Sequence, residues 1–193
     1  MQTPQPVSLR LNGVRLEPLG PQHETGLRAA AADGELWQLV VATVPEPENT
    51  AAYIRNALAM PDRIAFAVID ETDNDRIIGS TSYCNIVQTA KRLEIGYTWY
   101  AQSYWRSRVN TTCKYLLLHH AFDTLNVQTV GWRADLINTR SQQAIERLGA
   151  KKDGVLRGFQ TRRDGSIRDT VVYSMIREEW PQAEANLAAR LKP

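Results

Sequence analysis

The sequence predicts an α+β domain, a three-layer α/β arrangement in which helices flank a mixed sheet of about seven strands. Two observations carry this prediction. Runs with the residue pattern of strands form a block near each end of the chain. Between the two blocks lies one strand–helix–strand unit, the connection that can place neighbouring strands in parallel. A chain of 193 residues is of the size of one domain, so we treat residues 1–193 as a single unit.

The N-terminal part predicts one strand and two helices. Residues 1–12 are expected to form a loose or edge segment. Apolar and polar residues alternate over 14–19, as in a half-buried strand. A proline begins an alanine-rich helix over 21–33, which ends at Asp-Gly. Thr50 is expected to cap a second helix over 51–60.

The middle of the chain predicts three strands that pair as an antiparallel meander. They are expected over 64–70, 76–86 and 92–100. The polar run Asp73–Asp75 supplies the first turn between them. An apolar helix begins near Cys113 and completes this block.

The C-terminal part predicts a strand, a helix and a hairpin. The strand is expected over 129–135 and the helix over 139–148, where Gly149 ends it. The turn Arg163-Asp164-Gly165 joins the two strands of the hairpin, expected over 151–162 and 167–176.

The composition of the chain argues against several classes of function. The chain is 43% hydrophobic and 23% charged, which is ordinary for a globular protein. Its net charge of +2 is too small to indicate a nucleic-acid-binding protein. No apolar run approaches the length of a membrane span, and Met1–Pro6 lack the pattern of a signal peptide. We therefore expect a cytoplasmic protein, with Cys84 and Cys113 as buried thiols.

The most informative segment is a polar and basic loop, Trp105–Thr112, between the strand that ends at Tyr100 and the helix near Cys113. Such a junction gathers unpaired backbone N–H groups and the positive end of a helix dipole. A pyrophosphate suits that environment well. An ordinary helix cap by Asn110 or Thr111 is the alternative. The loop predicts a site for a phosphorylated cofactor.

With these elements in this order, the chain resembles the GCN5-related N-acetyltransferase (GNAT) superfamily, and within it the RimJ/RimL-like branch. The resemblance covers about residues 13–180. Four segments carry it: Glu94–Trp99, Tyr104–Thr111, Asn138–Ala150, and the pair 154–158 with 169–174. In the family the loop reads Gln/Arg-x-x-Gly-x-Gly/Ala. Here Arg108 stands at the central glycine and Asn110 at the final small residue.

The resemblance implies acetyl-CoA or coenzyme A as cofactor and a primary amine as acceptor, on a peptide N-terminus or a small molecule. By the same resemblance, Asn138 would bind the pantetheine arm and Ser141 would protonate the leaving thiolate. Glu94, an acid in a buried-looking strand, could serve as a general base directly or through water. The full expected cofactor site is Trp99, Tyr100, Trp105, Arg106, Ser107, Arg108, Val109, Asn110, Thr111, Asn138 and Ser141.

Two classes of function stay open. The first is an enzyme in which the amine attacks the acyl group directly within a ternary complex. The second is a non-catalytic CoA-binding or ligand-binding sensor on the same fold, which Arg108 in place of glycine favours. Acceptor contacts are expected from 36–47 and 160–169. No nucleic-acid or membrane partner is expected. No metal is expected either, because the adjacent His119 and His120 point in different directions on a helix. The acceptor, the length of the acyl group and a homodimer are left open.

Overall fold

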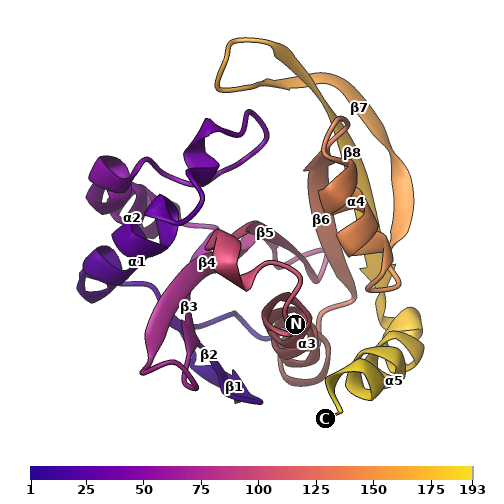
Figure 1. The fold of residues 1–193 in the computed structure, drawn as a ribbon. Helices are drawn as coiled ribbons and strands as arrows, with labels where there is room; N and C mark the ends of the chain where they lie inside the picture. Colours follow the sequence, from indigo (N-terminus) through magenta and orange to yellow (C-terminus); the bar gives the residue numbers. More distant parts are fainter. Residues whose placement is uncertain (193) are drawn as a thin grey trace.

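A computed structural model describes residues 1–192 and contains one mixed sheet of eight strands (Figure 1). The spatial order of the strands is β1-β2-β3-β4-β5-β6-β8-β7. Their bounds are β1 Leu9–Leu11, β2 Val14–Pro18, β3 Ile64–Asp70, β4 Arg76–Val87, β5 Arg92–Tyr100, β6 Thr129–Asp135, β7 Lys151–Thr161 and β8 Ile167–Ile176. The helices are α1 Glu24–Ala32, α2 Thr50–Ala59, α3 Val109–His119, α4 Thr139–Glu146 and α5 Trp180–Leu191.

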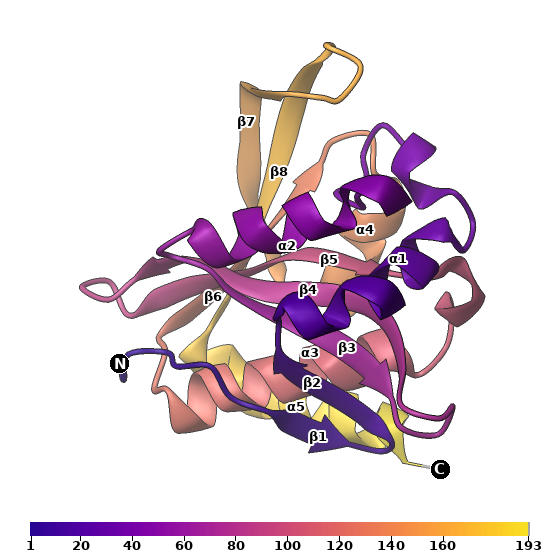
Figure 2. The same cartoon turned by 90° about the vertical axis from the view of Figure 1, so that its left-hand side faces the viewer.

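The helices cover both faces of the sheet, which confirms the predicted three layers. Helices α1 and α2 lie on one face, and α3 and α5 lie on the other (Figure 2). Each face has its own apolar core: Leu27 and Ile54 pack against Ala67 on the first, and Leu117 and Phe122 pack against Leu16 and other strand residues on the second. Fully buried side chains of this size each stabilise the fold by about 1.5–3 kcal/mol.

Strands β5 and β6 form the one parallel pair of the sheet within residues 1–192, and that pair is short. It runs from Arg92↔Thr129 to Glu94↔Gly131. Beyond Glu94 the two strands separate (Figure 1). We call this separation the strand split. Because both strands run in the same direction, the loop into α3 and the loop into α4 leave from the same, open end of the split.

A bulge interrupts β5 beside the split. Gly96 pairs with Ser82 and Trp99 pairs with Ser80, so two residues of β5 lie opposite the single Thr81. One of these two residues, Tyr97, has a φ of 51°. A bulge of this kind bends the strand and redirects the backbone groups next to it.

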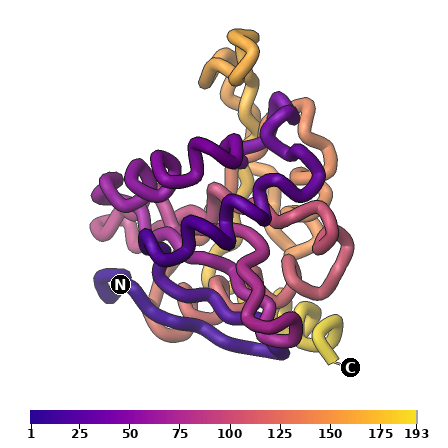
Figure 3. The backbone as a smooth tube through the Cα atoms, turned by 60° about the vertical axis from the view of Figure 1, so that its left-hand side comes forward, coloured from indigo at the N-terminus to yellow at the C-terminus, as the bar shows by residue number. Residues whose placement is uncertain are grey.

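The hairpin of β7 and β8 projects beyond the rest of the sheet (Figure 3). Its tip reaches the connection between α1 and α2. There the guanidinium of Arg163 donates hydrogen bonds to the backbone carbonyls of Trp37 and Val44. The two segments that were expected to contact the acceptor therefore lie side by side.

Most predicted elements are confirmed, and the bounds of β3, β5, β6 and β8 agree with the prediction. Two elements were not predicted, β1 and α5. Strand β1 is short and pairs with β2 across a turn at Asn12 and Gly13, which have φ of 48° and 72°. The start of α3 was wrong: the helix begins at Val109, because residues 109–112 form its first turn. Within residues 1–192, no helix is long and apolar enough to cross a membrane.

Candidate functional site

The strand split leaves one edge of β5 without a partner strand. Past Glu94, the backbone of β5 is paired with β4 on one side, and β6 has moved away on the other. An edge of this kind can bind an extended chain by main-chain hydrogen bonds, as when a peptide adds a strand to a sheet. The split can therefore hold a thin molecule that carries amide groups.

The N-terminus of α3 lies at the open end of the split, and the side chain of its N-cap residue, Arg108, does not cap it. The side chain of Ser107 accepts a hydrogen bond from the N–H of Val109. Within the described residues, the next two N–H groups, of Asn110 and Thr111, have no acceptor. Free N–H groups and the positive end of the helix dipole make this turn suitable for a phosphate oxygen.

The left-handed position of the preceding loop is at Arg106, not at Arg108. The φ of Arg106 is 61°, whereas Arg108 has an ordinary helical φ of −63°. At Arg108 the freedom of glycine is therefore not needed. The guanidinium of Arg108 donates to the carbonyl of Asn12 at 3.2 Å and to Thr72 at 3.1 Å, and it lies 3.6 Å from Asp70. The side chain is held by neighbouring turns in this structure, and its role in cofactor binding stays a prediction.

A cation–π contact joins the two sides of the split. The guanidinium carbon of Arg140, in the first turn of α4, lies 3.5 Å from the centre of the Trp105 ring. The indole N–H of Trp105 donates to the carbonyl of Tyr100 at 3.0 Å, which fixes the ring at the end of β5. Burial, and then the nearby charge of Arg106, lower the pKa of Arg140. Two guanidinium groups thus approach each other beside the N-terminus of α3, as expected where an anion binds.

Helix α4 starts on the opposite side of the split and has a capped N-terminus. The side-chain oxygen of Asn138 accepts a hydrogen bond from the N–H of Ser141 at 3.0 Å. The cap leaves the amide NH₂ of Asn138 and the hydroxyl of Ser141 available to other partners.

Glu94 lies where the strands part, and its carboxylate is fully engaged. Only 3% of the residue is exposed. The carboxylate accepts hydrogen bonds from Asn85 at 2.8 Å, from Arg92 at 3.0 Å and from Arg133 at 3.0 Å. These donors come from β4, β5 and β6, so Glu94 connects three strands at the closed end of the split.

Two residues expected beside the cofactor have their side chains in the cores. Trp99 is 5% exposed and packs between the sheet and the α1–α2 layer, where its ring N–H donates to Tyr53. Tyr100 is 8% exposed and packs in the core on the α3 face. The alternation of a strand explains both placements. Their place beside the cofactor stays a prediction, and the groups that β5 offers at the split are those of its backbone.

Comparison with known proteins agrees with this geometry. The family model described as "Acetyltransferase (GNAT) domain" matches residues 14–151. The chain belongs to the GNAT acetyltransferase family. The loop before α3, the start of α4 and the β7–β8 hairpin lie in the segments that carried the resemblance in the sequence.

Known GNAT proteins resemble the chain in sequence and in structure. The uncharacterized N-acetyltransferase YoaA of Bacillus subtilis (strain 168) is 27% identical over 56% of this chain and 60% of its own length. The chain spans about 60% of the length of the curated relatives it matches.

Solved structures cover more of the chain. A GCN5-related N-acetyltransferase from Brucella melitensis has a TM-score of 0.89 and 27% identity, and the match covers 98% of this chain and 87% of that one. RimJ of Mycobacterium smegmatis, solved in complex with CoA-disulfide, has a TM-score of 0.78 at 18% identity, over 96% of this chain and 93% of that one. At that identity the second likeness shows the fold alone.

The GNAT core contains a buried lysine that the sequence analysis overlooked. Lys114 is 6% exposed, and its amine donates to the hydroxyl of Thr98, in the bulge of β5, at 2.8 Å. The Thr98 hydroxyl is in turn 2.8 Å from that of Thr81. Burial lowers the pKa of Lys114 to about 8. A lone lysine in the apolar run Cys113–Leu118 was the available signal.

Both cysteines are free and buried, as predicted. Burial raises the pKa of the Cys84 thiol to about 12 and that of the Cys113 thiol to about 12. Since the thiolate is the nucleophilic form, neither side chain is suited to attack a thioester.

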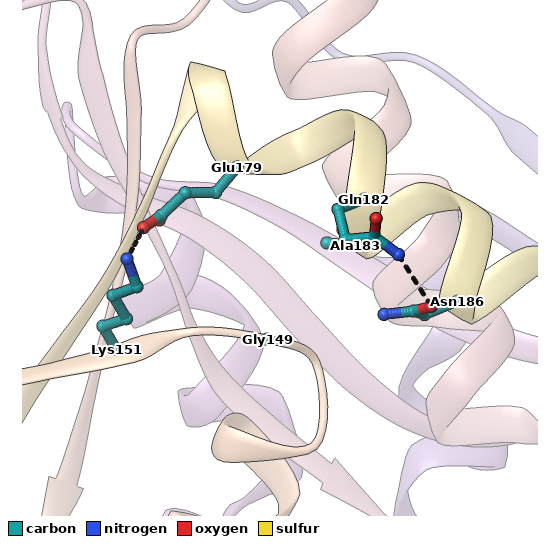
Figure 4. A pocket seen from close by; sticks show the side chains of 6 residues that line it. All are labelled: Gly149, Lys151, Glu179, Gln182, Ala183 and Asn186. Atoms are coloured by element: carbon teal, nitrogen blue, oxygen red, sulfur yellow. Dashed lines mark hydrogen bonds and ion pairs between the residues drawn. The ribbon is translucent and has the colours of Figure 1, made fainter.

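Two further features lie away from the split. The side chains of His119, Asp123 and Glu184 bring their polar atoms within 4.8 Å of one another on the exposed end of α3 and the face of α5. A hollow of about 240 Å³ lies between the α4–β7 turn and α5, and Figure 4 labels the residues that line it. Its polar side chains are paired with each other, Lys151 with Glu179 and Gln182 with Asn186. Neither feature is joined to the split.

Proposed function

We propose that the chain is an acetyl-CoA-dependent N-acetyltransferase that acts on a primary amine. One observation carries the proposal: two parallel strands part after three residue pairs, and the N-terminus of a helix stands at the open end of the gap. A structural neighbour of the same fold, RimJ of Mycobacterium smegmatis, was solved with CoA-disulfide. Acetyl-CoA would supply an activated acyl thioester.

The residues that would hold the pantetheine and phosphate groups divide into two sets. The free edge of β5 past Glu94 offers N–H and C=O groups to amides. The N–H groups of Asn110 and Thr111 offer donors to a pyrophosphate, and Ser107 and Val109 shape the turn that presents them. Two guanidinium groups, those of Arg106 and Arg140, add charge beside that turn.

The β6 side of the split would supply the polar side chains for the reaction. The amine nitrogen forms a bond to the acyl carbon, and the bond from that carbon to sulfur breaks. The hydroxyl of Ser141 would give a proton to the departing sulfur. Backbone N–H groups at the bulge of β5 would stabilise the oxyanion.

Glu94 would act as an anchor for a water molecule that receives the proton of the amine. Its carboxylate already accepts hydrogen bonds from two arginines and an asparagine. Those donors occupy oxygen lone pairs that direct abstraction of a proton would need. Removal of the proton through ordered water fits this environment better than direct abstraction.

Transfer would be direct, without an acyl-enzyme. Both thiols are buried and have pKa values raised to about 12. A nucleophile of that kind lacks the partnered base that covalent catalysis needs. The amine and the acyl donor would therefore be bound at the same time.

The test is amine-dependent release of free thiol from acetyl-CoA, measured with a panel of primary amines and peptide N-termini. The proposal predicts release that requires both the protein and an amine, with initial-rate lines that intersect. Binding of CoA without release for any amine would favour the alternative, a CoA-binding sensor on the same fold. Parallel lines, or an acylated cysteine in mass spectrometry, would contradict direct transfer.

A further inference from the structure

A basic pocket lies between the tip of the β7–β8 hairpin and the α1–α2 connection, the two segments that approach each other in Figures 1 and 3. Its volume is about 160 Å³. Residues 40–43 form one wall, and the other walls come from Asp135 at the end of β6, Thr161, Arg162, Arg163 and Arg168. The lining thus carries three guanidinium groups and a single carboxylate, which leaves it with an excess of positive charge.

The three arginines differ in how far they are satisfied. Arg162 forms a two-pronged ion pair with Asp135, at 2.6 Å and 2.9 Å, and this pairing lowers the pKa of Asp135. Arg163 is bound to backbone carbonyls, which fix its position without neutralising its charge. The Nε of Arg168 is 3.9 Å from Asp135, which is too far for a hydrogen bond.

A second donor lies beside Arg168. The Nε of Arg168 and the hydroxyl of Thr170 are both buried, and neither has a partner within the described residues. The two residues are two positions apart on β8, so they share one face of the sheet. Thr170 pairs directly with Asp135 of β6. Buried donors without acceptors are rare in folded proteins and call for an explanation.

The pocket adjoins the place where the acyl group would be. Asp135 is the last residue of β6, and its side chain accepts a hydrogen bond from the N–H of Ile137, next to Asn138. Asn138 and Ser141 follow at once and form the start of α4. Asp135, which lines the pocket, is thus close in sequence to Ser141, the residue that would protonate the leaving sulfur.

We propose that this pocket binds a carboxylate carried by the acceptor amine. The inference rests on the proposed acetyltransferase function and deepens it, because it names the chemical class of the acceptor. Arg168 would donate hydrogen bonds to the carboxylate, and Arg163 would add charge from the hairpin tip. The carboxylate could be that of a free amino acid, or the acidic side chain of a peptide next to its N-terminus.

The experiment compares matched amines that differ in one carboxylate. β-Alanine and its amide form the first pair. Peptides with Ser-Asp and Ser-Asn at the N-terminus form the second pair. For at least one pair, kcat/KM of the carboxylate member should exceed that of the neutral member by about tenfold or more. The pair that shows the preference identifies the source of the carboxylate.

Single substitutions test whether the pocket is the source of the preference for the carboxylate amine. Arg168→Gln should remove most of it while it changes kcat/KM for the neutral amine by no more than about twofold. Arg157→Gln is the control, because it removes the same charge from an exposed position on β7.

The outcomes separate this inference from the function on which it rests. Turnover of both members of each pair at equal rates, or an equal loss for both in Arg168→Gln, would overturn the pocket assignment alone. If no amine is acetylated, calorimetric titration of the same pairs in the presence of CoA still decides. Tighter binding of the carboxylate members that Arg168→Gln abolishes would support the pocket and count against the enzyme. Equal binding would overturn the pocket.

Discussion

The two sides of the strand split present different chemical groups, the backbone on the β5 side and side chains on the β6 side. On the β5 side, Trp99 and Tyr100 are buried in two separate cores, and the strand presents its backbone edge to the split. On the β6 side, charged side chains are exposed in or beside the split, among them Arg133 and Arg140. Backbone groups suit a feature shared by every acyl-CoA, and side chains suit a variable acceptor. The contrast indicates that cofactor binding depends on backbone groups of β5, whereas the choice of acceptor depends on side chains on the β6 side.

The largest effect is expected at Glu94, which joins the two sides. Glu94→Gln removes a buried charge that holds Arg92 and Arg133, and each arginine side chain is only about one-third exposed. Unpairing such a cluster should lower the free energy of unfolding by about 3 kcal/mol. Denaturant unfolding of the wild type and the variant measures this loss of free energy. The control Glu24→Gln breaks an exposed pair with Arg28 and should cost less than about 0.5 kcal/mol. Equal losses in the two variants would mean that Glu94 is not the joint between the strands.

The next effect concerns Lys114 beneath the β5 side. Burial lowers the pKa of this lysine from 10.5 to about 8 in the folded chain. Between these values the unfolded chain holds more protons, so this group makes stability rise with pH from about 8 to 10.5. Below about pH 8, the buried charge of Lys114 lowers the free energy of unfolding by up to about 3 kcal/mol. Lys114→Met should therefore raise stability at neutral pH and remove the rise.

The measurement for Lys114 is the free energy of unfolding as a function of pH, in the wild type and in Lys114→Met. Only the difference between the two curves is used, because the buried cysteine thiols titrate in the same range and oppose the trend. Lys152→Met, at an exposed position of β7, is the control and should leave the curve parallel to that of the wild type. Parallel curves for Lys114→Met would contradict a buried, uncompensated amine.

Ser141 tests the β6 side for chemistry. Ser141→Ala should lower kcat by about a hundredfold and change KM for the acyl donor much less, since an acid contributes mainly in the transition state. The cap to the backbone of residue 141 is kept, because Asn138 accepts from its N–H. Gln143→Ala, in the same helix, is the control. An unchanged kcat would remove Ser141 from the proposed mechanism and leave the fold assignment standing.

The smallest effect is expected from the cations at the open end of the split. Arg140→Gln should weaken CoA binding by about tenfold, because it removes one charge from the proposed phosphate site. Arg108→Gln is the matched comparison, and it should change CoA affinity by less than about threefold, since its guanidinium is held by Asn12 and Thr72. Calorimetric titration measures both. A larger loss for Arg108 than for Arg140 would mean that the loop rearranges when the cofactor binds.

The sequence predicted the sheet well because strands carry their own signals. The alternation of apolar residues and the turn residues that bound each run placed Ile64–Asp70 and Thr129–Asp135 without error. It did not predict that β5 and β6 part after Glu94, because loss of pairing between strands far apart in sequence has no local pattern. The same holds for the Arg140–Trp105 contact, which depends on how two loops meet.

The site was predicted in position more accurately than in detail. The loop before α3 and the start of α4 do lie at one end of the split, as the resemblance implied. The side chains of Trp99 and Tyr100 pack in the cores and that of Arg108 is held by neighbouring turns, because packing and ion pairs decide side-chain direction. Glu94, which the sequence offered as a base directly or through water, is paired with Arg92 and Arg133.

The central claim is that the strand split binds the acyl carrier, and thermal unfolding with coenzyme A tests it most directly. Ligand at 100 times its dissociation constant should add about 2.7 kcal/mol of stability. For a chain of this length that corresponds to a rise in Tm of about 5–10 °C. NAD, a dinucleotide with a similar pyrophosphate, should give no comparable rise. No shift in Tm at millimolar coenzyme A would contradict the account.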